Sequence, residues 1–187
     1  MYQSGLYAFL KRETPLFNEV LKYLSPQPED QILEIGCNRG RLVRKLQEIA
    51  PNTYGIDVNA QAIKAGVASN LRVMDATHLD FPDGFFDKIY SIHTIEHIPD
   101  LREAVCETAR VTKKGGKVFL VYPAEPIRGL YAVFGALLLR ENPRNLHLHK
   151  LSPKRLLQEF IEGTGLKHVK SEFSIFPPQY ITLLEKI

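Results

Sequence analysis

The sequence predicts an α/β fold in which a mostly parallel sheet is covered by helices on both faces. Between residues 31 and 123, short apolar runs alternate with segments of helical periodicity, and strand–helix repeats of this size are typical of parallel sheets. The last two apolar runs, 166–176 and 179–187, are separated only by a turn at Pro177 and Pro178. We expect these two strands to be antiparallel, because a parallel pair needs a long crossover connection.

The first predicted element is a helix over residues 15–24. Thr14 can cap it and Pro15 fits its first turn, where the missing N–H costs nothing. One face of this helix is apolar, formed by Leu16, Val20, Leu21 and Leu24. The proline-rich segment 25–30 ends the helix.

The strand–helix repeats follow in order. Strands are predicted over 31–36, 53–58, 71–76, 86–92 and 117–123, and helices over 40–50, 60–68 and 100–112. A last helix over 152–165 has Ser152 as its N-cap and Pro153 at its first position. No internal repeat or long linker divides the chain. We therefore expect one domain over 1–187, with residues 1–25 as an N-terminal helical cap.

Composition excludes several classes of protein. With 44% hydrophobic and 24% charged residues, the 187-residue chain suits a globular protein, and a net charge of +3 is too small for a dedicated nucleic-acid binder. The N-terminus does not read as a secretory signal, and the longest uncharged apolar run, 129–139, is too short to span a bilayer. Cys37 and Cys106 form no metal or redox pattern. A cytoplasmic protein is expected.

A glycine-containing loop follows the first predicted strand, in the stretch ILEIGCNRGRL at 32–42. A dinucleotide-binding loop reads G-x-G-x-x-G, whereas this loop reads G-x-N-x-G. Gly36 and Gly40 would let the backbone approach a ligand and turn into the helix, and Asn38 tolerates left-handed geometry. The missing glycines argue against a pyrophosphate, and so against a nicotinamide-dependent oxidoreductase.

Two aspartates follow the next two predicted strands. Asp57 lies 21 residues after Gly36, where a carboxylate can accept both hydroxyls of an adenosine ribose. Asp75 ends the third strand, where it could accept a hydrogen bond from an adenine amino group. Either residue alone could be an ordinary turn aspartate. Together with the loop they line one edge of one sheet, which favours an adenosyl cofactor without a pyrophosphate.

These motifs resemble those of the class I S-adenosylmethionine-dependent methyltransferases, in particular the small-molecule, quinone-biosynthesis-like group. The resemblance rests on ILEIGCNRGRL, GIDVN, the stretch from VMDATHLDF to HIPDL, and ARVTKKGGKVFLVYP, and it covers residues 30–123. It implies a Rossmann-like seven-stranded sheet with an antiparallel last strand and S-adenosyl-L-methionine as the cofactor. The implied cofactor-binding residues are Glu34, Gly36, Cys37, Asn38, Gly40, Asp57, Val58, Asp75, Ala76 and His93.

Methyl transfer from a sulfonium depends mainly on aligning the two reactants, and it needs a general base only if the nucleophile holds a proton. The candidates for catalysis are His97 and Tyr122, at the ends of the fourth and fifth strands. A hydrogen-bonded structural role for His97 and a core position for Tyr122 are the alternatives. His147 and His149 alternate as metal ligands can, but no third ligand is identifiable, so no metal is predicted.

The segment 124–150 is where this fold class commonly builds acceptor specificity. Its apolar run is followed by Arg140, Arg144, Lys150, Lys154 and Arg155. This pattern suits an apolar small-molecule acceptor such as a quinone precursor, or a peripheral contact of 127–155 with an anionic membrane surface. Packing on the core or in a dimer interface is the alternative, and the oligomeric state stays open. A non-catalytic module that binds an adenosyl cofactor or a partner is the second function considered.

Overall fold

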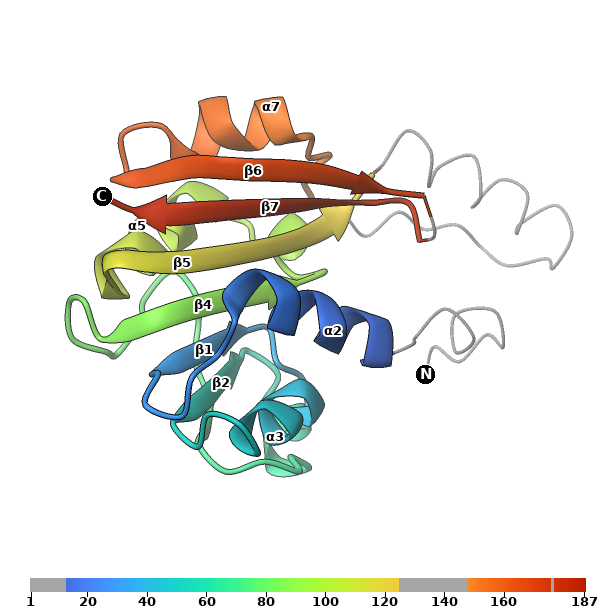
Figure 1. Cartoon of the computed structure of the whole chain (residues 1–187), viewed down its shortest axis with the longest axis vertical. Helices are drawn as coiled ribbons and strands as arrows, with labels where there is room; N and C mark the ends of the chain where they lie inside the picture. The colour runs from blue at the N-terminus through green and yellow to red at the C-terminus, as the bar shows by residue number, and fades with distance from the viewer. Residues whose placement is uncertain (1–12, 125–147, 176) are drawn as a thin grey trace, which may run out of the picture.

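A computed structural model describes residues 13–124, 148–175 and 177–187. One sheet runs through the molecule with helices on both of its faces (Figure 1). Its seven strands lie in the order β3-β2-β1-β4-β5-β7-β6. The strands are β1 Ile32–Ile35, β2 Thr53–Asp57, β3 Leu71–Val73, β4 Phe86–Ile92, β5 Thr112–Pro123, β6 Leu166–Ser174 and β7 Gln179–Lys186. The predicted α/β fold is confirmed.

The direction of each strand also matches the prediction. β3, β2, β1, β4 and β5 pair in parallel, whereas β7 is antiparallel to both of its neighbours, β5 and β6. Because the first five strands are parallel, their carboxyl ends meet at one edge of the sheet, and ligands of open α/β sheets bind at that edge.

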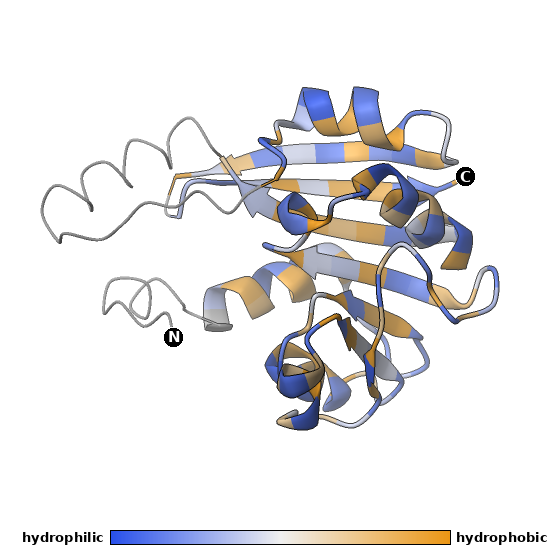
Figure 2. Cartoon of the chain, turned by 180° about the vertical axis from the view of Figure 1, so that it is seen from behind, coloured by the Kyte–Doolittle hydropathy of each residue, from blue (hydrophilic) through white to orange (hydrophobic). Residues whose placement is uncertain are grey.

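The helices cover the sheet as two layers. They are α2 Glu13–Leu24, α3 Arg41–Gln47, α4 Ala60–Lys64, the 3₁₀ turn η1 Ile95–His97, α5 Leu101–Val111, α7 Pro153–Arg155 and the π-helical segment η2 Leu156–Ile161. On one face α2 and α3 pack on the sheet through Leu24, Leu46 and Phe119. On the other face the core includes residues of α5 and η2, among them Val105 and Phe160. Figure 2 shows hydrophobic residues running along the strands between these layers.

Several elements differ from the sequence prediction in their bounds or type. The third strand ends at Val73 instead of residue 76, because its partner β2 ends at Asp57, the residue paired with Val73. The second helix of the repeats ends at Lys64 and the fifth strand begins at Thr112, before its predicted start. The last helix begins with Ser152 Oγ accepting from the Arg155 N–H at 3.3 Å, as expected of an N-cap, and then widens into η2.

Candidate functional site

The loop between β1 and α3 is held in left-handed backbone geometry at three positions. Gly36 has φ 82°, Asn38 φ 52° and Gly40 φ 70°. Asn is one of the few side chains that tolerate this region, because its short polar group adds little steric conflict. The expectation that Asn38 preserves the turn is confirmed.

The two loop glycines are required by the protein's own packing. A Cβ on Gly36 would lie 2.0 Å from Thr94 Oγ1, and a Cβ on Gly40 would lie 2.6 Å from Leu71 Cδ2. The space that a side chain would fill at these positions is therefore taken by the chain itself. Gly36 lets the loop approach the turn after β4, and Gly40 lets it approach β3.

Asp57 closes this loop from the end of β2. Its Oδ2 accepts the Asn38 N–H at 2.8 Å, and its Oδ1 accepts the Asn59 N–H at 2.8 Å. A carboxylate oxygen has two lone pairs, so each oxygen can accept one further hydrogen bond, as two ribose hydroxyls would require. Val58 follows with 69% of its surface exposed, which sets an apolar side chain beside the carboxylate.

The neighbouring candidates at the end of β3 lie in a turn. Asp75 is exposed, and its Oδ1 accepts both the N–H and the hydroxyl of Thr77 at 2.9 Å. These bonds are those of an ordinary aspartate turn, the alternative considered for this residue. Ala76 is buried in the core cluster.

Glu34 is a buried carboxyl group in the middle of the site. Its Oε2 accepts the Tyr90 hydroxyl at 3.1 Å on the neighbouring strand. Burial raises the pKa of Glu34 to about 8, against the opposing effect of hydrogen bonds from Tyr90 and the Val43 backbone, and the charge of Asp57 raises it further. A cation placed beside Glu34 would favour its ionised form.

Cys37, the neighbour of Gly36 in the loop, is buried as well. Burial raises the pKa of its thiol, and the charges of Glu34 and Asp57 act in the same direction. The thiol is therefore protonated and is no nucleophile at neutral pH.

Two histidines flank one buried carboxylate at the end of β4. The His93 Nδ1 and the His97 Nε2 each lie 3.8 Å from Glu96 Oε1, and the Glu96 side chain is 1% exposed. His93, at φ 51°, also places its Nε2 3.1 Å from Gln179 Oε1 at the start of β7. The sequence analysis named both histidines but missed Glu96 and Gln179. The i, i+3 spacing of His93 and Glu96 could have indicated Glu96. Gln179 lies 86 residues away from His93, so no local spacing indicates it.

Tyr122 lies near the carboxyl end of β5, with its side chain enclosed in the core. Its side chain is 0% exposed, and its hydroxyl is 2.9 Å from Thr182 Oγ1 on β7. Burial raises the pKa of this hydroxyl above its ordinary value. This is the core position that was the alternative for Tyr122, and the side chain is enclosed because both faces of the sheet are covered.

The described end of the acceptor-side segment is attached to η1. The backbone N–H groups of Leu148 and His149 both donate to the Glu96 carbonyl, at 2.9 and 3.1 Å. His149 Nε2 lies 2.8 Å from the Ile98 carbonyl oxygen. Residues 125–147, with the apolar run and His147, lie outside the described residues. Among those that are described, no group of three or more His, Cys, Asp or Glu side chains is placed to hold a metal ion.

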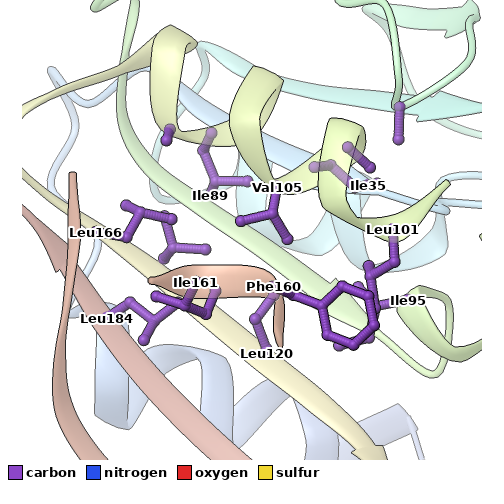
Figure 3. Packing of buried hydrophobic residues seen from close by; sticks show 14 of the residues in the cluster. Ile35, Ile89, Ile95, Leu101, Val105, Leu120, Phe160, Ile161, Leu166 and Leu184 are labelled. Atoms are coloured by element: carbon purple, nitrogen blue, oxygen red, sulfur yellow. The ribbon is translucent and has the colours of Figure 1, made fainter. Parts of the chain in front are cut away.

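Packed apolar side chains lie behind the β1 and β4 ends of this edge. Figure 3 shows Ile95 next to Leu101 of α5 and Phe160 of η2, within the core cluster that also contains Ile35. A small apolar cavity lies among these residues and belongs to the core. Such dense packing fixes the backbone that carries Glu34, Gly36 and Glu96. In the described part of the chain, no helix is long and apolar enough to cross a membrane.

A family model described as a methyltransferase domain matches residues 33–120. The ubiquinone biosynthesis O-methyltransferase of Pectobacterium carotovorum is 27% identical over 184 aligned residues, covering 89% of this chain and 76% of that protein. The 2-methyl-6-phytyl-1,4-hydroquinone methyltransferase of Synechocystis is 34% identical over 97 residues, covering 48% of this chain and 30% of that protein. A probable chloroplastic tocopherol O-methyltransferase of rice is 34% identical over 101 residues, covering 48% of this chain and 28% of that protein. The chain thus spans less than a third of the length of the Synechocystis and rice proteins.

Solved structures with the same fold include both a methyltransferase and a cyclase. Geranyl diphosphate C-methyltransferase from Streptomyces coelicolor, solved with S-adenosyl-L-homocysteine, has a TM-score of 0.71 at 14% identity, covering 94% of this chain and 78% of that one. The [4+2]-cyclase SpnF has a TM-score of 0.72 at 16% identity, covering 92% of this chain and 80% of that one. At these identities the likeness is one of fold, and it does not distinguish a methyltransferase from a cyclase.

Proposed function

Because the chain belongs to the class I S-adenosylmethionine-dependent methyltransferases, we propose that it transfers a methyl group to a hydroxyl oxygen of a small apolar acceptor with a quinol-like ring. The observation that carries this proposal is the loop between β1 and α3, bonded to Asp57 with acceptor capacity left on both carboxylate oxygens. A pyrophosphate-binding loop would instead present its glycines to the ligand.

We assign the cofactor to the sheet edge that these residues form. Asp57 would accept the ribose hydroxyls, with Val58 beside the base, and Glu34 would face the cationic methionine end through the loop 36–40. Ala76 and Asp75 would border the adenine, and His93 would border the methionine end. When bound, S-adenosylmethionine supplies an electrophilic methyl group on a sulfonium.

The remaining task of the protein is to align the acceptor and to remove its proton. His97 is assigned as the proton acceptor, since it lies at the carboxyl end of β4, with a side chain 43% exposed. An imidazole suits this role because it changes charge near neutral pH. Tyr122 has no part in the proposal, because its hydroxyl is buried against Thr182.

The acceptor class rests on the names of the relatives together with the sequence of the segment 124–150. Two of these relatives are named for ubiquinone biosynthesis and for a phytyl hydroquinone. Both names describe an aromatic ring that carries an apolar chain, and the run GLYAVFGALLL offers apolar surface of the kind that would cover such a chain. We assign the protein to the cytoplasm as a single domain without a nucleic-acid partner, in peripheral contact with anionic membrane through 127–155.

The first test is calorimetric titration with S-adenosylmethionine, S-adenosylhomocysteine and NAD in parallel. The proposal requires binding of the two adenosyl ligands and none of NAD. An acceptor screen then compares apolar catechols and hydroquinones with their methyl ethers, which have no free hydroxyl. Adenosyl binding without turnover on any hydroxylated acceptor would instead support the non-catalytic module, and no adenosyl binding would contradict both.

A flotation assay with anionic and neutral vesicles tests the membrane contact separately. Binding to the anionic vesicles alone is expected, with loss of binding at high salt because screening weakens attraction to the surface. Equal recovery with both kinds of vesicle, or with neither, would contradict the assignment to an anionic surface.

A further inference from the structure

Glu96 is a buried acid that the proposed reaction has not used. Its side chain is 1% exposed, and among the described residues neither carboxylate oxygen accepts a hydrogen bond. Leaving a buried polar group without hydrogen bonds destabilises the folded state, and a charged group does so more strongly. Such a cost is expected where a group serves function and not stability.

The position of Glu96 is defined from two sides. It lies in η1, the single turn that follows β4, and its backbone carbonyl accepts the N–H groups of Leu148 and His149. The turn thereby lies between His93, the first residue after β4, and the segment that follows residues 125–147. η1 also packs into the core through Ile95, and the Glu96 side chain is buried with it.

Both histidines of the site approach the same carboxylate oxygen. The His93 Nδ1 and the His97 Nε2 are each 3.8 Å from Oε1, a distance that exceeds a hydrogen bond and at which a carboxylate attracts an imidazole ring once that ring is protonated. Catalytic contacts are often this long in a free enzyme and shorten in the complex. The Gln179 amide, 3.1 Å from the His93 Nε2, fixes the His93 ring from its other edge.

We propose that Glu96 is a positioning residue for the transfer reaction: its buried carboxylate, shared by His93 and His97, orients the His97 ring and stabilises the positive charge that this ring acquires. This inference rests on the proposed function. The acceptor hydroxyl gives its proton to the His97 imidazole, and its electron pair forms the new O–CH₃ bond while the C–S electron pair leaves with sulfur. The half-exposed His97 then releases the proton to water.

The charged and titratable groups around Glu96 come from three parts of the chain. His93 approaches from β4, His97 lies next to Glu96 in η1, and His149 reaches the turn from the segment after 147. The His149 ring is directed to the Ile98 carbonyl, whereas the bond from His149 to Glu96 is made by its backbone N–H. Glu96 therefore acts on His93 and His97.

The test compares Glu96→Gln, which keeps the shape and removes the charge, with Glu103→Gln, which removes an exposed carboxylate nearby on α5. Glu96→Gln should lower kcat by at least about tenfold, within the roughly 10²–10⁴-fold that a positioned acid–base group contributes, with KM and cofactor affinity changed less than about threefold. Its Tm should equal or exceed that of the wild type, because among the described residues the change removes no hydrogen bond from the carboxylate. Glu103→Gln should match the wild type throughout.

A double-mutant cycle asks whether Glu96 acts through His97. Once His97→Asn is present, adding Glu96→Gln should lower kcat by less than about twofold, since the group that Glu96 positions is gone. A full additional loss would overturn the proposal. So would a wild-type kcat in Glu96→Gln, or a fall in Tm that accompanies the fall in kcat.

Nitrogen-15 spectra of the histidine rings provide a readout that needs no acceptor. The ring signals of both His93 and His97 should shift in Glu96→Gln and stay in place in Glu103→Gln. Unchanged signals in Glu96→Gln would overturn the positioning role. If the wild type shows no transfer while the ring signals respond as expected, the proposed function fails and the contact between carboxylate and histidines stands.

Discussion

The backbone N–H of Asn38 donates a 2.8 Å hydrogen bond to Oδ2 of Asp57 and so joins the loop after β1 to the end of β2. The two residues are 19 positions apart, and each is assigned to a different part of the adenosyl cofactor. A change at either residue therefore affects both parts of the site.

Asp57→Ala should weaken S-adenosylmethionine binding by about 1–3 kcal/mol, because the ribose hydroxyls lose their acceptor and the Asn38 and Asn59 amides lose their bonds. Calorimetric titration measures the change, with Asp80→Ala, an exposed carboxylate after β3, as the matched control. An unchanged affinity would remove Asp57 from the site.

Asn38→Gly should leave the free energy of unfolding within about 0.5 kcal/mol of the wild type, because φ 52° is open to glycine. Asn38→Val places a β-branched residue in the left-handed region and should cost about 1–2 kcal/mol or more. Urea denaturation of the three proteins measures both values. Equal stability of the Val and Gly variants would show that the loop relaxes out of this conformation.

Gly36→Ala should destabilise the protein more than Gly115→Ala does. Both glycines have positive φ, at 82° and 77°, so both variants acquire backbone strain. A Cβ on Gly36 also meets Thr94 at 2.0 Å, whereas a Cβ on Gly115 has nothing within 4 Å. We expect a gap of at least about 1 kcal/mol in the free energy of unfolding, as overpacking usually costs about 1–3 kcal/mol. Similar losses for the two variants would contradict the close contact with Thr94.

Glu34→Gln should change how the stability of the free protein depends on pH. The Glu34 pKa is raised from 4.5 to about 8 in the folded state, so between these values the folded protein holds a proton that the unfolded chain has lost. Stability from this group is therefore present below pH 4.5 and declines as the pH rises toward 8. The glutamine of the variant resembles the protonated acid and has no such decline.

Denaturant unfolding at pH 5, 7 and 9 measures this effect as the difference between Glu34→Gln and the wild type. The free energy of unfolding of Glu34→Gln, relative to that of the wild type, should rise by more than about 1 kcal/mol between pH 5 and pH 9. Glu103→Gln, at an exposed site, corrects for the general effect of losing one carboxylate. Parallel pH curves for the variant and the wild type would contradict the raised pKa of Glu34.

The local patterns of the sequence determined much of this fold. The alternation of short apolar runs with helical segments predicted β1 to β5 and their helices, and the short turn at Pro177 and Pro178 predicted the antiparallel pair β6 and β7. The left-handed turn at Asn38 was also predicted from residue type. These features depend on neighbours a few positions away, which is why a single sequence contains them.

Only the tertiary structure decided which side chains meet at the edge. Tyr122 was a candidate for catalysis with a core position as the alternative, and it lies buried against Thr182, 60 residues further along the chain. The Gln179 amide reaches His93 across 86 residues. In the sequence, Glu96 is an acidic residue next to His97 with no sign of burial. In the structure, η1 packs into the core and the Glu96 side chain is buried. Burial and long-range contacts follow from how strands and helices stack, and no local pattern of residues encodes them.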